Sequence, residues 1–140
     1  MKKVYPVFIA ENKQDYLVYV PDMDIYTEGK NMADAIEMAR DAIGLKGVDL
    51  EDDGKLLPEP SDYQSALKKA GSDKEFFDYS KGIMTLVDID FTAYRLRTDN
   101  KMVRRNVTLP NWMNQEAEKA KINVSKVLQE ALMIKLGLPK

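Results

Sequence analysis

Near its C-terminal end the chain reads Val103-Arg104-Arg105-Asn106-Val107-Thr108-Leu109-Pro110, and two segments with helical spacing of apolar residues follow, over 111–121 and 125–136. Residues 103–109 alternate in polarity as a β-strand does, because successive side chains of a strand point to opposite faces. A lone strand leaves its backbone donors and acceptors unpaired, and no second strand is expected close to it in the sequence. The simplest partner is the same strand of a second copy, paired antiparallel across a two-fold axis.

The polarity of this strand predicts which side chains face outward. Val107 and Leu109 are apolar, so their face is expected to pack on the two helices. The opposite face then presents Arg104, Asn106 and Thr108. A two-stranded ribbon fits the major groove of DNA, where arginine matches guanine and asparagine matches adenine. We therefore expect these three residues to contact bases, and Arg105 to contact a phosphate.

The two helices complete this C-terminal segment. Pro110 suits the start of the first helix, Asn123 or Ser125 can cap the second, and Gly137 can end it. The amides at the start of the second helix, around Val124, Ser125 and Lys126, predict a second phosphate contact. Fewer than about 50 residues bury too little surface to fold alone, so dimerisation through the strand and helices is part of the prediction. Assembly beyond the dimer is left open.

The order of these parts resembles a known DNA-binding fold. A basic alternating strand, a proline, a helix, a capped turn and an apolar helix follow one another from Arg104 to Leu132. This arrangement is similar to a ribbon-helix-helix domain of the Arc/MetJ/CopG type. The resemblance implies a homodimer that binds operator DNA in the major groove.

The front of the chain predicts a small antiparallel sheet with packed helices. Alternating apolar stretches indicate strands over residues 4–9, 16–20, 25–27 and 83–91. One helix is expected after Asn31, ending at Gly44 or Gly47, and a short one over 63–69 capped by Ser61 or Asp62. The acidic segment 49–62, with its glycine and prolines, predicts a loop. The fold class is thus α+β, with a first domain over 1–92, a linker over 93–102 and a second domain over 103–140.

Composition restricts the chemistry. The chain has neither cysteine nor histidine, so disulfides, thiolate catalysis and the commonest metal ligand are all excluded. Residues 1–94 hold 11 Lys/Arg and 19 Asp/Glu, a balance of −8, whereas residues 95–140 hold 10 and 4, a balance of +6. This division favours a cationic partner for the front and a polyanion for the tail. No long apolar run or signal peptide is seen, which predicts a cytoplasmic protein. We also expect no bound cofactor and no bound metal.

The front half also resembles a known family. The stretch Tyr5-Pro6-Val7-Phe8-Ile9, then Tyr16 to Asp22, then Thr27-Glu28-Gly29 and a helix containing Ala33 to Ala39 is similar to the HicB antitoxins. The resemblance implies a partial ribonuclease-H-like domain without nuclease activity, which binds and occludes HicA, a small basic mRNA-cleaving ribonuclease. It further implies a type II antitoxin whose tail represses its own operon. Three carboxylates could contribute to the toxin contact or simply be solvated turn residues: Asp22, Asp24 and Glu28.

Two other functions remain open at this point. A magnesium-dependent nuclease of the ribonuclease-H type would need several converging carboxylates, and the candidates are Asp22, Asp24, Glu28, Asp88 and Asp90. The alternation of Asp88 and Asp90 with apolar neighbours is equally typical of a strand with one polar face. The other alternative is a ligand-sensing ribbon-helix-helix repressor, for which the sequence offers no glycine-rich phosphate loop.

Overall fold

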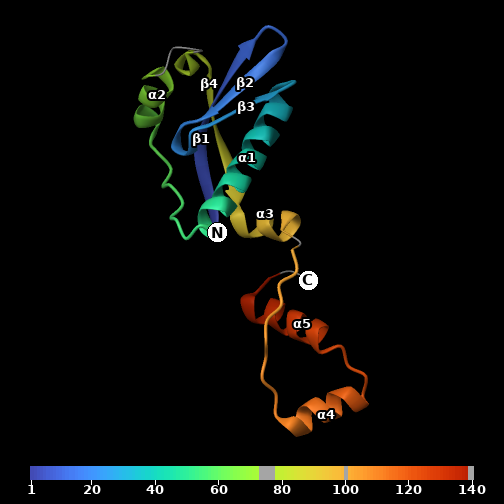
Figure 1. Cartoon of the computed structure of the whole chain (residues 1–140). Coiled ribbons are helices and arrows are strands. Elements are labelled where there is room, and N and C mark those ends of the chain that lie inside the picture. Colours follow the sequence, from blue (N-terminus) through green and yellow to red (C-terminus); the bar gives the residue numbers. More distant parts are fainter. Residues whose placement is uncertain (73–77, 100, 139–140) are drawn as a thin grey trace. The chain divides into compact units, whose positions relative to one another are not determined.

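The computed structural model describes residues 1–72, 78–99 and 101–138. The chain divides into two compact units, Met1–Lys101 and Met102–Lys140, and each is described separately below (Figure 1).

The first unit is built on a four-stranded antiparallel sheet, with strands β1 (Lys2–Asn12), β2 (Asp15–Val20), β3 (Ile25–Gly29) and β4 (Ile83–Asp90). The strand order is β3-β2-β1-β4, so β1 lies inside the sheet between β2 and β4. In the register of the sheet, Phe8 lies opposite both Tyr19 of β2 and Met84 of β4. All four strands predicted for the front half are therefore confirmed, and the first two form the expected hairpin.

Helices cover both faces of this sheet (Figure 1). On one face Val7, Val18 and Val87 pack against helix α1 (Met32–Asp52) in the larger core. On the other face Phe8 and Tyr19 pack against Ala66 and Ala70 of helix α2 (Tyr63–Ser72). Since side chains of a strand alternate between faces, β1 contributes to both cores. The α+β class is confirmed for this unit.

Helix α1 begins where the sequence predicts and ends later. Asn31 caps it, because its side-chain oxygen accepts a hydrogen bond of 2.8 Å from the amide of Asp34. The prediction that Gly44 or Gly47 ends the helix is wrong, and the helix continues to Asp52. Both glycines are buried, and a Cβ atom would lie 2.5 Å from the Tyr94 ring at Gly44 and 2.1 Å from the Phe91 ring at Gly47. They serve close packing rather than helix termination.

The rings that pack on these glycines belong to helix α3 (Phe91–Thr98). The predicted linker over 93–102 is therefore wrong for its first six residues, which are helical and part of the first unit. Asp90 caps α3 by accepting from the amide of Ala93 at 3.1 Å. Arg95 then bonds Asp52 at 2.9 Å and Glu51 at 3.2 Å, both at the end of α1. The charged residues of 92–102 suggested a solvated segment, whereas one of them, Arg95, holds α3 on α1.

The connection from α1 to α2 is shorter than predicted. Residues 49–52 of the expected loop belong to α1, and the remaining residues lead to α2. Asp62 caps α2, since its carboxylate accepts from the amide of Ser65 at 2.8 Å. Two short 3-10 helices, η1 (Pro21–Met23) and η2 (Tyr79–Lys81), follow β2 and precede β4.

The second unit contains helices α4 (Asn111–Lys119) and α5 (Val124–Leu136). Asn123 caps α5 by accepting from the amide of Lys126 at 3.1 Å, and Gly137 ends it with a positive φ of 69°. Helix α4 is two residues shorter than predicted. Residues 101–110 form no helix, and no described segment of the single chain pairs with them as a strand. The predicted ribbon requires a second chain, so it stays a prediction.

Candidate DNA-binding and protein-binding surfaces

The second unit exposes its apolar side chains. None of the described residues of α4 and α5 is buried. The large apolar side chains that are exposed here are Met102, Val103, Val107, Leu109, Trp112, Met113, Ile122, Val124, Val127, Leu132, Ile134 and Leu136. Monomeric proteins rarely leave so many large apolar side chains of one small unit in water, so a further molecule is needed to cover them.

The residues predicted to contact bases lie in the extended segment before α4. Arg104, Arg105, Asn106 and Thr108 are all exposed. None of these four forms a hydrogen bond or ion pair with the described part of the chain, so each is available to an external group. The structure therefore leaves the predicted base and phosphate contacts accessible, and the contacts themselves stay predictions.

The predicted phosphate site lies at the start of α5. Lys126 has its amide bound to the cap Asn123. Amides of a first helical turn have no acceptor inside the helix, so those of Val124 and Ser125 remain for an outside group. Val124, Ser125 and Lys126 are all exposed. The dipole of a helix favours an anion at this end.

The carboxylates predicted to contact a toxin have different surroundings. Asp22 accepts from the amide of Ser61 at 2.9 Å and also from its hydroxyl, which ties the segment before α2 to η1. Asp24 has a left-handed backbone with φ 50° and pairs with Lys69 of α2 at 3.0 Å. Glu28 is exposed on the edge strand β3. The first two therefore have internal structural roles, and a toxin contact by any of the three stays a prediction.

The aspartates of β4 are held by neighbouring cations and amides. Asp88 pairs with Lys2 at 3.4 Å and with Arg40 at 3.3 Å, and these hydrogen bonds lower its pKa. Asp90 has a lowered pKa chiefly because it accepts the Ala93 amide. Within the described ranges, no three Asp or Glu side chains gather closely enough to hold a metal ion. The carboxylate cluster that a ribonuclease-H-type nuclease needs is not assembled there.

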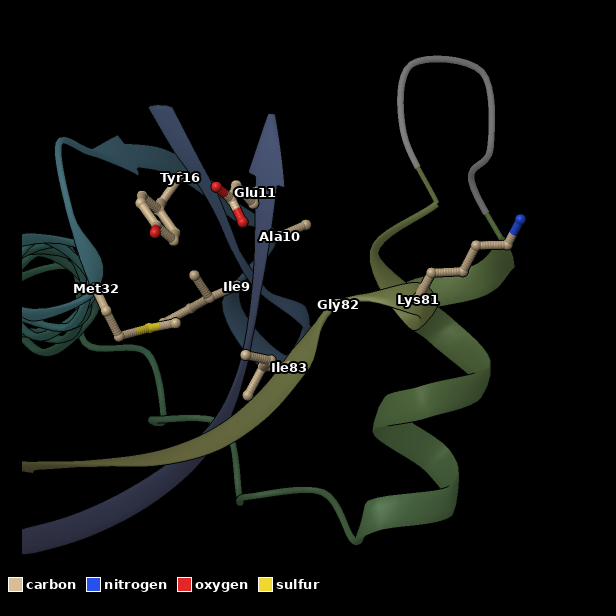
Figure 2. Close-up of a pocket in the computed structure, with 8 residues that line it drawn as sticks. All are labelled: Ile9, Ala10, Glu11, Tyr16, Met32, Lys81, Gly82 and Ile83. Carbon is tan, nitrogen blue, oxygen red and sulfur yellow. The ribbon is translucent and has the colours of Figure 1, made fainter. Parts of the chain in front are cut away.

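Two features of the first unit were not predicted from the sequence. Tyr19, Tyr26 and Tyr79 form an aromatic group, in which the first two rings stack with centroids 4.8 Å apart. The second feature is a hollow of about 360 Å³ beside the start of α1, which Figure 2 shows. It is lined by Ile9, Ala10, Glu11, Tyr16, Met32, Lys81, Gly82 and Ile83. The alternation of Ile9 and Glu11 places them on one face, but only the sheet register brings Ile83 alongside.

A family model described as HicB-like antitoxin of bacterial toxin–antitoxin system matches residues 5–132. The chain belongs to the HicB-like antitoxin family. The resemblance expected from the sequence is thereby confirmed, and the match covers most of both units. This HicB-like protein is accordingly an antitoxin of a bacterial toxin–antitoxin system.

Solved structures are similar to this HicB-like chain over nearly its whole length. A chain from a toxin–antitoxin complex of Streptococcus pneumoniae is 25% identical with a TM-score of 0.58, covering 96% of this chain and 99% of that chain. The antitoxin HicB of Burkholderia pseudomallei is 22% identical with a TM-score of 0.51, covering 96% of each chain, and shares the fold. No curated protein matches the chain. Among the described residues, none of the helices has the length and apolar character needed to cross a membrane.

Proposed function

We propose that this HicB-like antitoxin neutralises a HicA-like mRNA-cleaving ribonuclease through its first unit. We also propose that it represses its own operon by binding operator DNA as a homodimer through residues 103–140. The family match and the similarity to a chain of a toxin–antitoxin complex support the first activity. A toxin that cleaves mRNA and an operator on DNA both imply a cytoplasmic location.

The dimer rests on one observation, the exposed apolar surface of the second unit. Val107 and Leu109 precede α4, Trp112 lies in its first turn, and Val127 and Leu132 lie along α5, yet all five are exposed in the single chain. Below about 40 residues a unit seldom folds without added stabilisation, and association with another copy supplies it. A second copy that pairs its residues 103–109 with these would satisfy the backbone groups and cover the apolar side chains together.

The DNA-binding role follows from what the paired strands would present. Arg104, Asn106 and Thr108 of both copies would lie on the ribbon face opposite Val107 and Leu109. Arg104 is suited to a bidentate contact with guanine and Asn106 to one with adenine. Arg105 and the amides of Val124 and Ser125 would bind phosphates on either side of the groove.

The toxin-binding role draws on charge as well as family. Residues 1–94 carry a net charge of −8, which suits a basic partner and raises the rate of encounter with it.

We propose further that this protein is not itself an enzyme. In support, the candidate carboxylates Asp22, Asp88 and Asp90 are each bound to groups of the chain, and no three carboxylates in the described part of the chain lie closely enough to hold a metal ion. Purified protein is expected to leave RNA and RNA–DNA hybrid intact in the presence of magnesium.

The DNA-binding proposal is tested with a matched pair of charge removals. Arg104→Ala should weaken binding to the operon's own promoter by at least roughly 5- to 150-fold, because each bidentate contact contributes about 1–3 kcal/mol and the dimer carries Arg104 twice. Lys119→Ala removes the same charge from α4 and should change affinity much less, through the general electrostatic contribution alone. Both are titrated at one fixed salt concentration. Equal affinity of Arg104→Ala and the unaltered protein would show that Arg104 does not contact a base.

The toxin-binding proposal is tested by co-expression. The chain and the short reading frame next to it are expressed together, and the complex is recovered through a tag on the antitoxin. We expect the two proteins to co-purify and the toxin's ribonuclease activity to be inhibited. An adjacent reading frame whose basic product neither co-purifies nor is inhibited would refute this half of the proposal.

A further inference from the structure

The hollow beside the start of α1 has an apolar lining. Ile9 of β1 and Ile83 of β4 lie opposite each other in the sheet and face it together. Tyr16 from β2 and Met32, the first residue of α1, extend over the same space from the other side (Figure 2). Its volume of about 360 Å³ is sufficient for one or two large side chains of another molecule.

The backbone explains why the hollow is not filled by the protein's own residues. Helix α1 starts at Met32, so the hairpin end of β1 and β2 is reached only by its first turn. Gly82 lies just before β4, and a Cβ atom there would come within 2.6 Å of the carbonyl oxygen of Ile9. Any other residue at position 82 would push β4 away from β1. The glycine thus allows close pairing and contributes no side chain to the space.

The hollow is open to solvent and carries one available charge. Ile83 is 60% exposed although it lies on the face of the sheet that packs against α1. Glu11 is also exposed, and its carboxylate forms no hydrogen bond or ion pair within the described ranges 1–72, 78–99 and 101–138. The amine of Lys81 points away from the space (Figure 2). Among the described residues that line the hollow, an occupant therefore meets mainly apolar side chains and the carboxylate of Glu11.

We propose that this hollow is a docking site for the toxin, which inserts an apolar side chain between Ile83 and Met32 and places an adjacent Lys or Arg against Glu11. The inference rests on the proposed toxin-binding function and assigns it a surface. Charge identifies the occupant, because a basic protein suits both the exposed carboxylate of Glu11 and the −8 balance of residues 1–94. A small molecule is the weaker fit, since its sites enclose most of the ligand and place several polar groups around it.

The apolar half of the site is tested with two variants of β4. Ile83→Asp introduces a carboxylate into the hollow and should weaken toxin binding at least tenfold, because apolar side chains seated in pockets dominate such interfaces. Leu86→Asp is the matched control, since Leu86 lies on the same strand, is 62% exposed and faces the opposite side of the sheet. It should change affinity less than threefold. Because Ile83 and Leu86 are both exposed, we expect neither substitution to disturb the fold, and circular dichroism spectra of the two variants check this.

The charged half is tested in the same way. Glu11→Lys should weaken toxin binding about tenfold or more, and high salt should reduce the difference from the unaltered protein. Asp53→Lys makes the same change in net charge at the far end of α1, about 30 Å away by the rise of a helix. A loss confined to Glu11→Lys supports a local pair, and equal losses in both variants would refute it.

The outcomes separate this inference from the proposed function. Toxin that binds the unaltered protein and the Ile83→Asp variant equally would overturn the docking site while leaving the antitoxin activity standing. No binding by the unaltered protein would instead refute the proposed partner. A small molecule that occupies the hollow, as shown by shifts of the Ile83 methyl signals in NMR, and leaves toxin affinity unchanged would also overturn the inference.

Discussion

Replacing Gly47 with alanine should destabilise the first unit, although alanine is the better helix former. A Cβ atom at position 47 would lie 2.1 Å from Cε1 and 2.6 Å from Cδ1 of Phe91, whereas ordinary contact begins near 3.4 Å. The ring would have to move by more than about 1 Å, and overpacking of this kind costs about 1–3 kcal/mol. Phe91 has little room to move, because it is 2% exposed and its amide bonds the carbonyl oxygen of Met1 at 3.1 Å.

The net effect weighs this cost against helix propensity. Gly→Ala in a helix raises the free energy of unfolding by about 1 kcal/mol through helix propensity. If the packing cost lies near its upper value of about 3 kcal/mol, the net decrease in the free energy of unfolding is about 2 kcal/mol. For a unit of this size that lowers Tm by roughly 8–16 °C. Thermal unfolding followed by circular dichroism measures the loss, and hydrogen exchange of residues 91–98 tests whether α3 becomes less protected.

Gly71 provides the matched control. It lies in α2, and a Cβ atom there would come no closer than 3.3 Å, to the hydroxyl oxygen of Ser80. Gly71→Ala should leave Tm unchanged or raise it slightly. A Gly47→Ala variant with unchanged or higher Tm and unchanged protection of α3 would show that the α1–α3 contact does not require glycine.

Three further predictions concern caps and titrating groups. Asn123→Ala removes the cap of α5 and should cost the second unit about 1 kcal/mol, measured as a lower unfolding temperature of the C-terminal helices. The pKa of Asp88 is lowered in the folded state by Lys2 and Arg40, so its stabilising effect is present above the ordinary value of 3.8 and is lost as the pH falls through the lower folded value. Urea unfolding between pH 5 and pH 2, as approximate limits, should therefore show a shallower loss for Asp88→Asn. Burial raises the pKa of Tyr5 to about 12, so stability should fall as the pH rises from about 10 towards that value. The pKa values of Tyr79 and Tyr94 are also raised by burial, so Tyr5→Phe should reduce this dependence by the part that Tyr5 contributes. Unchanged alkaline unfolding in Tyr5→Phe would contradict the assignment.

Local pattern was a sufficient guide to most elements. Short apolar runs rich in aromatic and β-branched residues predicted β1, β2 and β3, and the alternation of apolar and polar residues predicted β4. The caps at Asn31 and Asp62 were also predictable, since the hydrogen bond joins groups three residues apart.

Long-range packing explains the two wrong predictions in the first unit. Gly44 and Gly47 look like helix ends when only their own propensity is considered. In the fold they lie against Tyr94 and Phe91, residues more than forty positions away, and the burial of those rings outweighs the weak helix propensity of glycine. The same contact converts the expected linker into α3, with Arg95 paired to the end of α1.

The two candidate surfaces differ in whether their residues are close in the sequence. The residues expected to contact DNA bases are two positions apart, and the two-residue period of a strand places them on one face. Arg104, Asn106 and Thr108 could therefore be proposed without a structure. The hollow could not be named, because Ile9 and Ile83 meet only through the register of β1 with β4.

Sequence by itself determined the four strands of the first unit, the starts of α1, α2 and α4, the division into an acidic front and a basic tail, and the antitoxin family. Each of these depends on neighbouring residues or on residue identity. Tertiary structure alone decided where α1 ends, that residues 91–98 belong to the first unit, and which side chains from β1, β2, β4 and α1 surround one hollow. The physical reason is distance along the chain. Contacts between residues dozens of positions apart form only when the whole sheet assembles, and no local preference encodes them.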